Sequence, residues 1–172
     1  MGMVLYGMDN TREITDEIMI RHASAVKKAS KKSLVFFDLP YSKNFSEDNI
    51  IRRTIKIFNQ TKCDGVKIEG NSELVDVIKY LTKKSIPVMA HVGLQPQKFS
   101  SASKFKIYGR KEDDLKNILN DCKALEKAGA ISILLEGMVT KIAKQITFAS
   151  KIPTIGIAVS YTHLTLPTIY SV

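Results

Sequence analysis

Four short apolar segments of this chain each carry an ionisable residue at or near their C-terminal end. Stretches with apolar residues at helical spacing separate them, and this alternation predicts parallel strands joined by right-handed helical crossovers. Catalytic groups gather at the C-terminal rim of such strands, so recurrence in four consecutive units indicates an active site. The segments are Ser33–Asp38, Gly65–Glu69, Ile86–His91 and Ile131–Glu136.

Five helices and two further strands complete the predicted elements. Thr15 can cap a helix that runs to about Ser30, Ser46 can cap the next, and Gly129 can end the fourth. The other three helices are predicted from stripes of apolar residues at helical spacing, and the two additional strands from short apolar runs. The stripes are Leu74–Leu81, Leu115–Leu125 and Val139–Ile146, and the strands are Met3–Tyr6 and Ile152–Ile157.

Six strands could form an open doubly wound sheet or most of an eight-stranded barrel. A nucleotide-binding sheet would carry a G-x-G-x-x-G after its first strand or a G-x-x-x-x-G-K-[ST] motif, and this chain has neither. The predicted fold is therefore α/β, of the (β/α)8 TIM-barrel family, as an incomplete barrel of about six parallel strands. We expect residues 1–158 to form one catalytic domain.

Composition limits the other possible functions. The net charge is +9, but the lysines are scattered and have no interleaved aromatic residues, which favours a solvated surface over nucleic-acid binding. No segment approaches the ~18 apolar residues of a membrane span, and the first residues lack a signal pattern. We expect a cytoplasmic protein that binds neither nucleic acid nor membrane, with Cys63 and Cys122 as unpaired thiols.

The ionisable residues are suited to enolate chemistry. Asp38 and Glu69 offer the hard oxygen ligands of Mg²⁺, which can act as a Lewis acid on a 2-oxo acid. Lys67 lies two residues before Glu69, so both side chains share one face of the strand, where the lysine needs a carboxylate partner. Partial burial of Glu136 would make this carboxylate a better base.

Each of these residues also has a purely structural interpretation. Asp38 before Leu-Pro could form a turn, and Lys67 with Glu69 could be an ion pair across the top of a barrel. His91 could be a hydrogen-bonded core histidine, and Glu136 before a glycine could be a solvated strand end. The residues favour a catalytic site only when they are considered together.

The connection from Val92 to Arg110 is much longer than the ~2 to 6 residues of most βα loops. Its glycines and small residues favour a lid or active-site loop. A surface loop without a role in catalysis is the alternative.

Seven motifs resemble the ketopantoate hydroxymethyltransferase family in their order and spacing. The resemblance runs from about Met1 to Ile157. The motifs are Gly2–Gly7, Asp38–Pro40, Val66–Gly70, His91–Gln97, Tyr108–Arg110, Ala128–Ala130 with Leu135–Glu136, and Ile152–Ile157.

The resemblance implies a (β/α)8 barrel enzyme of pantothenate biosynthesis, in the route to coenzyme A. The family transfers a hydroxymethyl group from 5,10-methylenetetrahydrofolate to 3-methyl-2-oxobutanoate, giving 2-dehydropantoate, with Mg²⁺ and as a homo-oligomer. By the same resemblance, Glu136 is the proton acceptor and His91 an active-site histidine in a supporting role. Asp38 and Lys67 bind the substrate, and Asp38 and Glu69 bind the metal.

The resemblance also implies that family segments are missing at both ends. A Gly-Asp-Ser triplet with a metal ligand would precede Met1, and a Gly-Ala-Gly turn would follow Ile157. We expect residues 159–172 to be a non-native tail and catalysis to be impaired or absent. The alternatives are another Mg²⁺-dependent enolising barrel enzyme, of the phosphoenolpyruvate mutase and isocitrate lyase kind, and a non-catalytic fragment.

Overall fold

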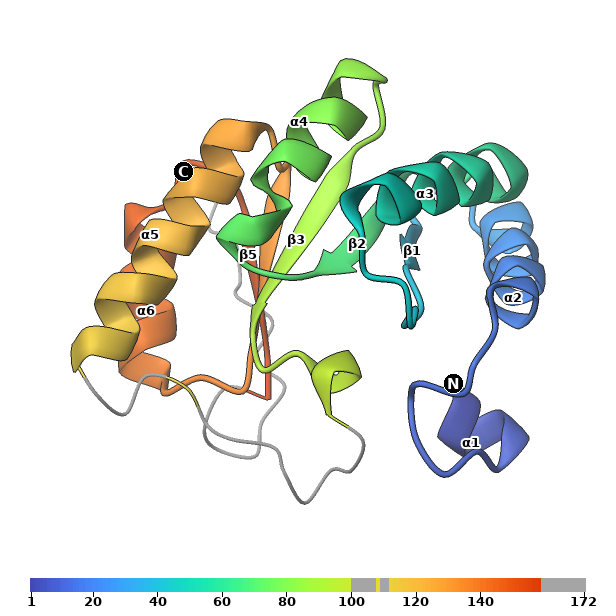
Figure 1. Cartoon of the computed structure of the whole chain (residues 1–172), viewed down its shortest axis with the longest axis horizontal. Helices are drawn as coiled ribbons and strands as arrows, with labels where there is room; N and C mark the ends of the chain where they lie inside the picture. The colour runs from blue at the N-terminus through green and yellow to red at the C-terminus, as the bar shows by residue number, and fades with distance from the viewer. Residues whose placement is uncertain (100–107, 109–111, 159–172) are drawn as a thin grey trace.

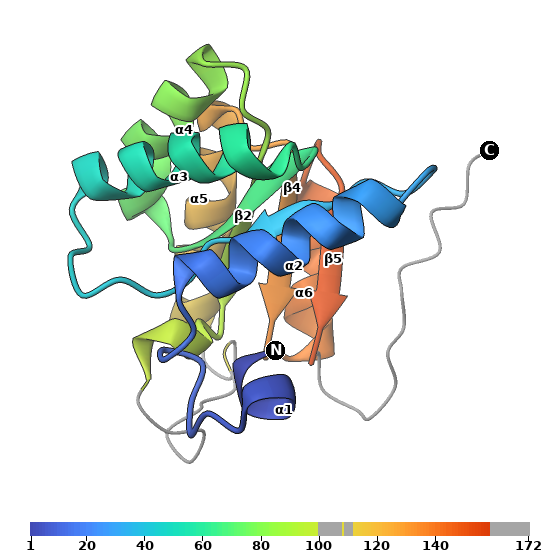
Figure 2. The ribbon, with the colours of Figure 1, turned by 90° about the vertical axis from the view of Figure 1, so that its right-hand side faces the viewer.

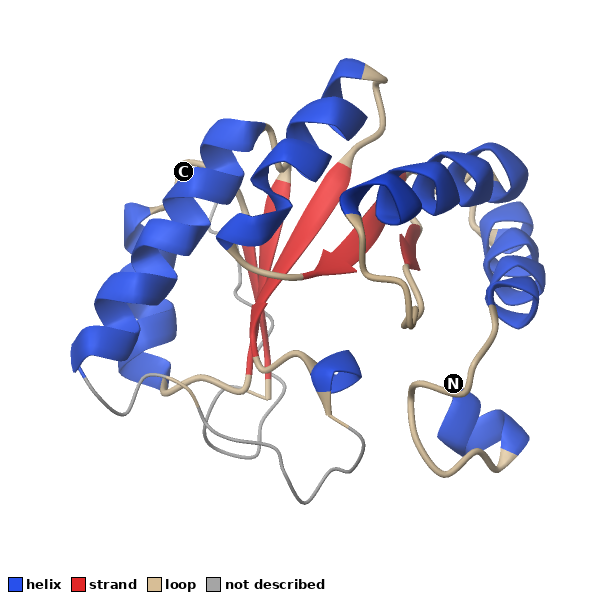
Figure 3. Ribbon diagram, viewed as in Figure 1, coloured by secondary structure: helices blue, strands red, loops and turns tan. Residues whose placement is uncertain are grey.

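The computed structural model describes residues 1–99, 108 and 112–158 of the chain. Its centre is a sheet of parallel strands that neighbour one another in chain order (Figures 1 and 3). Parallel strands in sequential order, each pair joined through a helix, are the connectivity of a β/α barrel, so the predicted α/β class is confirmed. The strands are β1 (Phe36–Asp38), β2 (Gly65–Glu69), β3 (Val88–Gly93), β4 (Ser132–Glu136) and β5 (Thr154–Ile157).

The predicted helices are present with the predicted caps. Thr15 Oγ1 accepts the N–H of Ile18, Ser46 Oγ accepts the N–H of Asn49, and Gly129 ends its helix with φ +105°. None of the helices in the described ranges is long and apolar enough to cross a bilayer. The helices are α2 (Asp16–Ala29), α3 (Glu47–Thr61), α4 (Val75–Lys83), α5 (Glu112–Ala128) and α6 (Thr140–Ala149), with 3-10 turns η1 (Ser72–Leu74) and η2 (Pro96–Lys98).

The predicted strand Met3–Tyr6 is wrong, because this segment belongs to a short helix, α1 (Gly2–Tyr6). The N–H of Leu5 donates to the carbonyl of Met1, and left-handed Gly7 ends the helix. A strand needs a neighbour for its backbone polar groups, and α1 lies apart from the sheet (Figures 1 and 2). The described residues therefore contain five strands instead of six.

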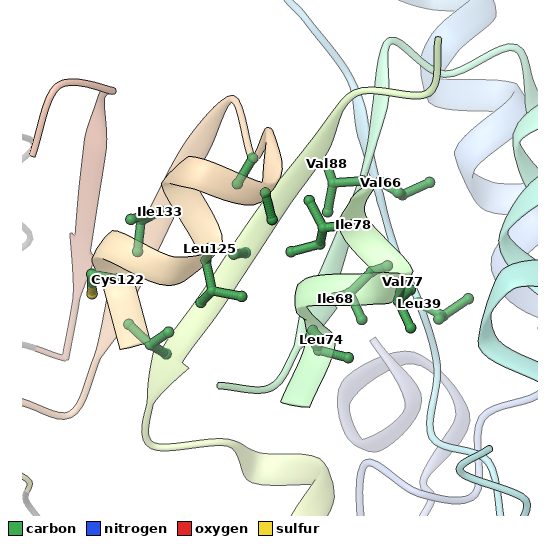
Figure 4. Packing of buried hydrophobic residues seen from close by; sticks show 14 of the residues in the cluster. Leu39, Val66, Ile68, Leu74, Val77, Ile78, Val88, Cys122, Leu125 and Ile133 are labelled. Carbon is green, nitrogen blue, oxygen red and sulfur yellow. The ribbon is translucent and has the colours of Figure 1, made fainter. Parts of the chain in front are cut away.

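The two faces of the sheet differ because successive side chains of a strand point to opposite sides. One face packs against α3, α4 and α5 and forms the hydrophobic core, part of which Figure 4 shows. Its strand residues are at most 2% exposed. They are Phe37, Val66, Ile68, Val88, Ala90, Val92, Ile133 and Leu135. The alternate residues, on the other face, include all five residues of the predicted site.

Both cysteines are buried and unpaired, as predicted. Cys122 lies on α5 within the core, and burial raises the pKa of its thiol to about 12. Because the thiolate is the reactive species, this cysteine is chemically inert in the folded chain.

Two ion pairs attach α2 to the rest of the fold. Lys27 Nζ lies 2.6 and 2.7 Å from the two carboxylate oxygens of Asp64, and the N–H of Val35 donates to the same carboxylate at 2.7 Å. Near the other end of α2, Arg53 binds Asp16 through two hydrogen bonds of 3.0 and 2.6 Å. Asp64 therefore fixes α2 beside the start of β1.

The Asp64 contacts predict an acid-dependent contribution to stability. Its hydrogen bond with Lys27 and that with the Val35 N–H lower the pKa of Asp64 below its ordinary 3.8. A lowered carboxylate pKa stabilises the fold above pH 3.8, and this contribution is lost as the pH falls through the folded-state value. The free energy of unfolding of the parent should therefore exceed that of Asp64→Asn by a margin that shrinks below pH 3.8.

Urea denaturation at a series of pH values measures this margin. Asp76→Asn is the matched control, because Asp76 forms an exposed ion pair with Lys79, which should contribute little at any pH. A margin for Asp64→Asn that stays constant down to the lowest pH would show that the carboxylate charge does not stabilise the fold.

Candidate active site

Four neighbouring strands bring the five predicted site residues to one face of the sheet. Asp38 is in register with Lys67, and Glu69 is in register with His91. Residues paired in a ladder point to the same face, and Glu136 ends the next strand, β4. Asp38, Glu69 and Glu136 are the last residues of their strands, as the sequence predicts for a site at the carboxyl rim.

Lys67 lies at the centre of the group. Its Nζ is 3.0 Å from Oδ1 of Asp38 and 3.1 Å from Nδ1 of His91. The side chain is only 14% exposed, and a buried ammonium needs such compensation. The expectation that this lysine has a carboxylate partner is confirmed, and the partner is Asp38.

The contact with Lys67 determines the tautomer of His91. An ammonium group only donates hydrogen bonds, so Nδ1 of the imidazole accepts and the proton of the neutral ring is on Nε2. This Nε2 lies 3.1 Å from Oε2 of Glu136, an ion-pair distance without hydrogen-bond alignment. The fully buried His91 ring therefore connects the lysine to the carboxylate at the end of β4.

Gly93 has no room for a side chain beside the backbone of Glu136. The register pairs Glu136 with Gly93, two residues beyond His91 on the same face. A Cβ on Gly93 would lie 2.3 Å from the carbonyl oxygen of Glu136, and the residue has φ +92°. The same carbonyl accepts the N–H of Leu94 at 2.8 Å, so this position requires glycine for both its conformation and its packing.

Glu69 is a buried carboxylate with several charged neighbours. Burial is the main cause that raises its pKa, and the nearby negative charge of Asp38 adds to the effect. His91, Lys67 and the N–H of Gln97, which donates to Oε2 at 3.0 Å, each act in the opposite direction. A carboxylate in this environment gains from a bound cation, because a cation stabilises its charged form.

The pair Asp38 and Glu69 fits a partly hydrated Mg²⁺ ion. Oδ1 of Asp38 is buried and lies 3.0 Å from Nζ of Lys67 without hydrogen-bond alignment, while the side chain as a whole is 47% exposed. No group of three or more His, Cys, Asp or Glu side chains in the described ranges could hold a metal. Mg²⁺ needs only one or two protein carboxylates, because it keeps several waters and binds substrate oxygens. The ligand pair stays a prediction.

Sequence reasoning missed two residues of this site. Gly93 and Gln97 both belong to the motif His91–Gln97, but neither has a chemical group that predicts a role. The close approach of Gly93 to Glu136 and the bond from Gln97 to Glu69 join elements that are far apart in the sequence, so no local pattern could indicate them.

Two other sequence-based expectations fall mainly on residues that the structure does not describe. Most of the predicted lid, residues 100–107 and 109–110, lies outside the described residues, and so does the predicted tail, residues 159–172. Tyr108 is described, and it forms a parallel bridge with Met138 just beyond Glu136. This bridge places Tyr108 beside a residue that is close in sequence to the end of β4 that carries Glu136.

Comparison with known proteins identifies close sequence relatives. The family model of ketopantoate hydroxymethyltransferase matches residues 1–162. A 3-methyl-2-oxobutanoate hydroxymethyltransferase of Rhizobium rhizogenes is 41% identical over 161 residues, which cover 93% of this chain and 59% of the relative. The enzyme of the same name from Brucella suis is 38% identical over 93% of this chain and 58% of its own length. The chain thus spans less than two thirds of the length of these relatives.

Solved structures with a similar fold have much lower sequence identity. A 2,3-dimethylmalate lyase of the PEP mutase/isocitrate lyase superfamily aligns with TM-score 0.61 and 16% identity, over 90% of this chain and 55% of its own. An oxaloacetate acetylhydrolase aligns with TM-score 0.63 and 14% identity, over 96% of this chain and 59% of its own. At these identities the likeness concerns the fold alone.

The geometry at Gly93 makes a direct prediction. Gly93→Ala should lower the free energy of unfolding by at least about 1–3 kcal/mol, the usual cost of a strained backbone conformation, because the new Cβ also collides with the Glu136 carbonyl. Gly7→Ala is the matched control, since Gly7 has φ +62° but nothing within 4 Å of an added Cβ.

Thermal and urea denaturation measure the free energy of unfolding of both variants. The difference between them separates the cost of the collision with the Glu136 carbonyl from the cost of backbone strain. The Gly93 variant should lose more stability than the Gly7 variant. Equal losses would mean that the Glu136 carbonyl moves aside without cost.

Proposed function

Because this chain belongs to the ketopantoate hydroxymethyltransferase family, we propose that it transfers a hydroxymethyl group from 5,10-methylenetetrahydrofolate to 3-methyl-2-oxobutanoate, giving 2-dehydropantoate. The observation that carries the proposal is the buried His91, which lies 3.1 Å from both Lys67 and Glu136. A base and a cation, which enolate formation requires, meet on one face of the sheet together with two further carboxylates.

The first step is proton removal from C3 of the keto acid. The Glu136 carboxylate accepts this proton, and the electron pair of the broken C–H bond forms the C2–C3 double bond of an enolate. Nε2 of His91 lies 3.1 Å from Oε2 of Glu136 without hydrogen-bond alignment, and a hydrogen bond formed here during the reaction would orient the carboxylate for the transfer. His91 therefore acts on the substrate through the base.

Lys67 provides positive charge for the substrate. Its ammonium group, held between Asp38 and His91, can bind the keto acid carboxylate or the developing enolate oxygen. When bound at Asp38 and Glu69, Mg²⁺ would supply Lewis-acid stabilisation of the same oxygen. The burial of Glu69 and His91 strengthens these interactions, because little water screens them.

The second step forms the new carbon–carbon bond. The enolate C3 bonds to the methylene carbon of 5,10-methylenetetrahydrofolate as one of the two bonds from this carbon to folate nitrogen breaks, and the proton held by Glu136 passes to that nitrogen. Water then replaces the second folate nitrogen on the same carbon and gives it a proton, so that 2-dehydropantoate and tetrahydrofolate leave. We propose that the protein acts in the cytoplasm, within pantothenate biosynthesis and as a homo-oligomer, as the family resemblance implies.

A second candidate is another enolising enzyme of the phosphoenolpyruvate mutase and isocitrate lyase kind. The solved structures with similar folds favour this reading only at the level of architecture, at 16% identity or less. Relatives with the proposed activity in their names are 38–41% identical, which supports the hydroxymethyltransferase. A non-catalytic fragment is the third possibility.

Deuterium exchange at C3 of 3-methyl-2-oxobutanoate tests the first step without folate. In D₂O with Mg²⁺, the chain should catalyse loss of the C3–H signal in the NMR spectrum. Glu136→Gln should slow this exchange by roughly 100-fold or more, the usual contribution of a general base. Glu17→Gln, an exposed position on α2, should leave the rate unchanged.

The outcomes separate the three candidates. Exchange that persists in Glu136→Gln would rule out Glu136 as the base. Exchange of a different 2-oxo acid but not of 3-methyl-2-oxobutanoate would favour the second candidate. A folded chain that exchanges neither would be a non-catalytic fragment.

A further inference from the structure

One residue of the turn η2 is bonded to the ends of both β1 and β2. The backbone N–H of Gln97 donates to Oε2 of Glu69 at 3.0 Å, and its side-chain Nε2 donates to the carbonyl of Leu39 at 2.8 Å. Leu39 directly follows Asp38. We infer that Gln97 is a positioning residue that holds the carboxylates of Asp38 and Glu69 in the geometry that binds Mg²⁺. This inference rests on the proposed function.

The turn makes the backbone N–H of Gln97 available. In a 3-10 turn the first N–H groups have no partner within the turn, and here the internal bonds run from Lys98 to Gln95 and from Phe99 to Pro96. The N–H of Gln97 is therefore free to bind Glu69. With Oε2 held in this way, Oε1 lies on the side of the histidine, 3.9 Å from Nδ1 of His91.

The side chain of Gln97 acts on the other carboxylate through the adjacent peptide. Leu39 donates its N–H to the carbonyl of Lys67 at 3.0 Å and accepts the Gln97 amide on its own carbonyl. β1 has only three residues and, within the described part of the chain, pairs with β2 alone. Hydrogen bonds outside the β1–β2 ladder, such as the one from Gln97 to the Leu39 carbonyl, therefore help to fix the position of Asp38.

The turn itself is anchored to the segment that follows β2. Pro96 is its first residue and has a fixed φ, and the side chain of Gln95 donates to Oδ1 of Asn71, beyond the end of β2, at 2.6 Å. Gln97 therefore binds the two strand ends from a fixed support. Its amide is specifically suited to this role, because a glutamate could not donate to the Leu39 carbonyl.

Residues that position the ligands of Mg²⁺ affect its affinity because this ion requires nearly ideal octahedral geometry. Residues that orient metal ligands typically change affinity by 10–100-fold when they are replaced. Gln97→Met keeps the length of the side chain and the backbone N–H but removes the donor to Leu39. We expect it to weaken metal binding by roughly 10–100-fold.

Mn²⁺ binding to the 172-residue chain, followed by the EPR signal of free Mn²⁺, measures affinity independently of activity. Gln97→Met should raise the dissociation constant, while Gln145→Met, an exposed position on α6, should not. In the C3 exchange assay, the Gln97 variant should need more Mg²⁺ but approach the parent rate at saturation. A purely structural role would lower the thermal midpoint without this shift in Mg²⁺ dependence.

The result also separates this inference from the proposed function. A parent chain that binds no Mn²⁺ would contradict the metal site itself, and the inference with it. A parent that binds Mn²⁺, with a folded Gln97→Met variant of equal affinity, would overturn the role of Gln97 alone. Gln97→Asn keeps the amide but is one methylene too short, so it provides a second variant with the same expected loss if Gln97→Met does not fold.

Discussion

The two faces of this sheet lie in different environments, so each strand must carry apolar side chains on one face and can carry charged ones on the other. In β2, Val66 and Ile68 point into the core beneath the helices. Lys67 and Glu69 alternate with them along the strand, so their side chains must point to the opposite face. A shift of one residue would exchange the two sets and bury the charges against the helices. The hydrophobic core thus fixes the position of the site.

Within the site, each buried charge has a neighbour of complementary chemistry. Asp38 compensates Lys67, which donates to His91, which in turn faces Glu136. The contacts cross four strands, so they depend on the ladder as a whole. Gly93 allows β3 to pair with β4 at Glu136, because a Cβ at this position would collide with the Glu136 carbonyl.

The sequence contained the positions of the site residues but not their contacts. Apolar segments ending in Asp38, Glu69 and Glu136 predicted a common rim, because parallel strands align their carboxyl ends. Thr15 could be identified as a cap because a capping residue acts within one turn. The segment Met3–Tyr6 was too short to distinguish a strand from a helix. The bond from Gln97 to Glu69 depends on the path of a turn between strands, which no local pattern encodes.

Crystals of the chain soaked with Mn²⁺ and 3-methyl-2-oxobutanoate would test the account most directly. The anomalous signal of Mn²⁺ should lie between the carboxylates of Asp38 and Glu69, with the keto acid carboxylate or carbonyl beside Lys67 and its C3 facing Glu136. A metal bound to other residues, or a keto acid bound on the other face of the sheet, would contradict the assignment of this face as the active site.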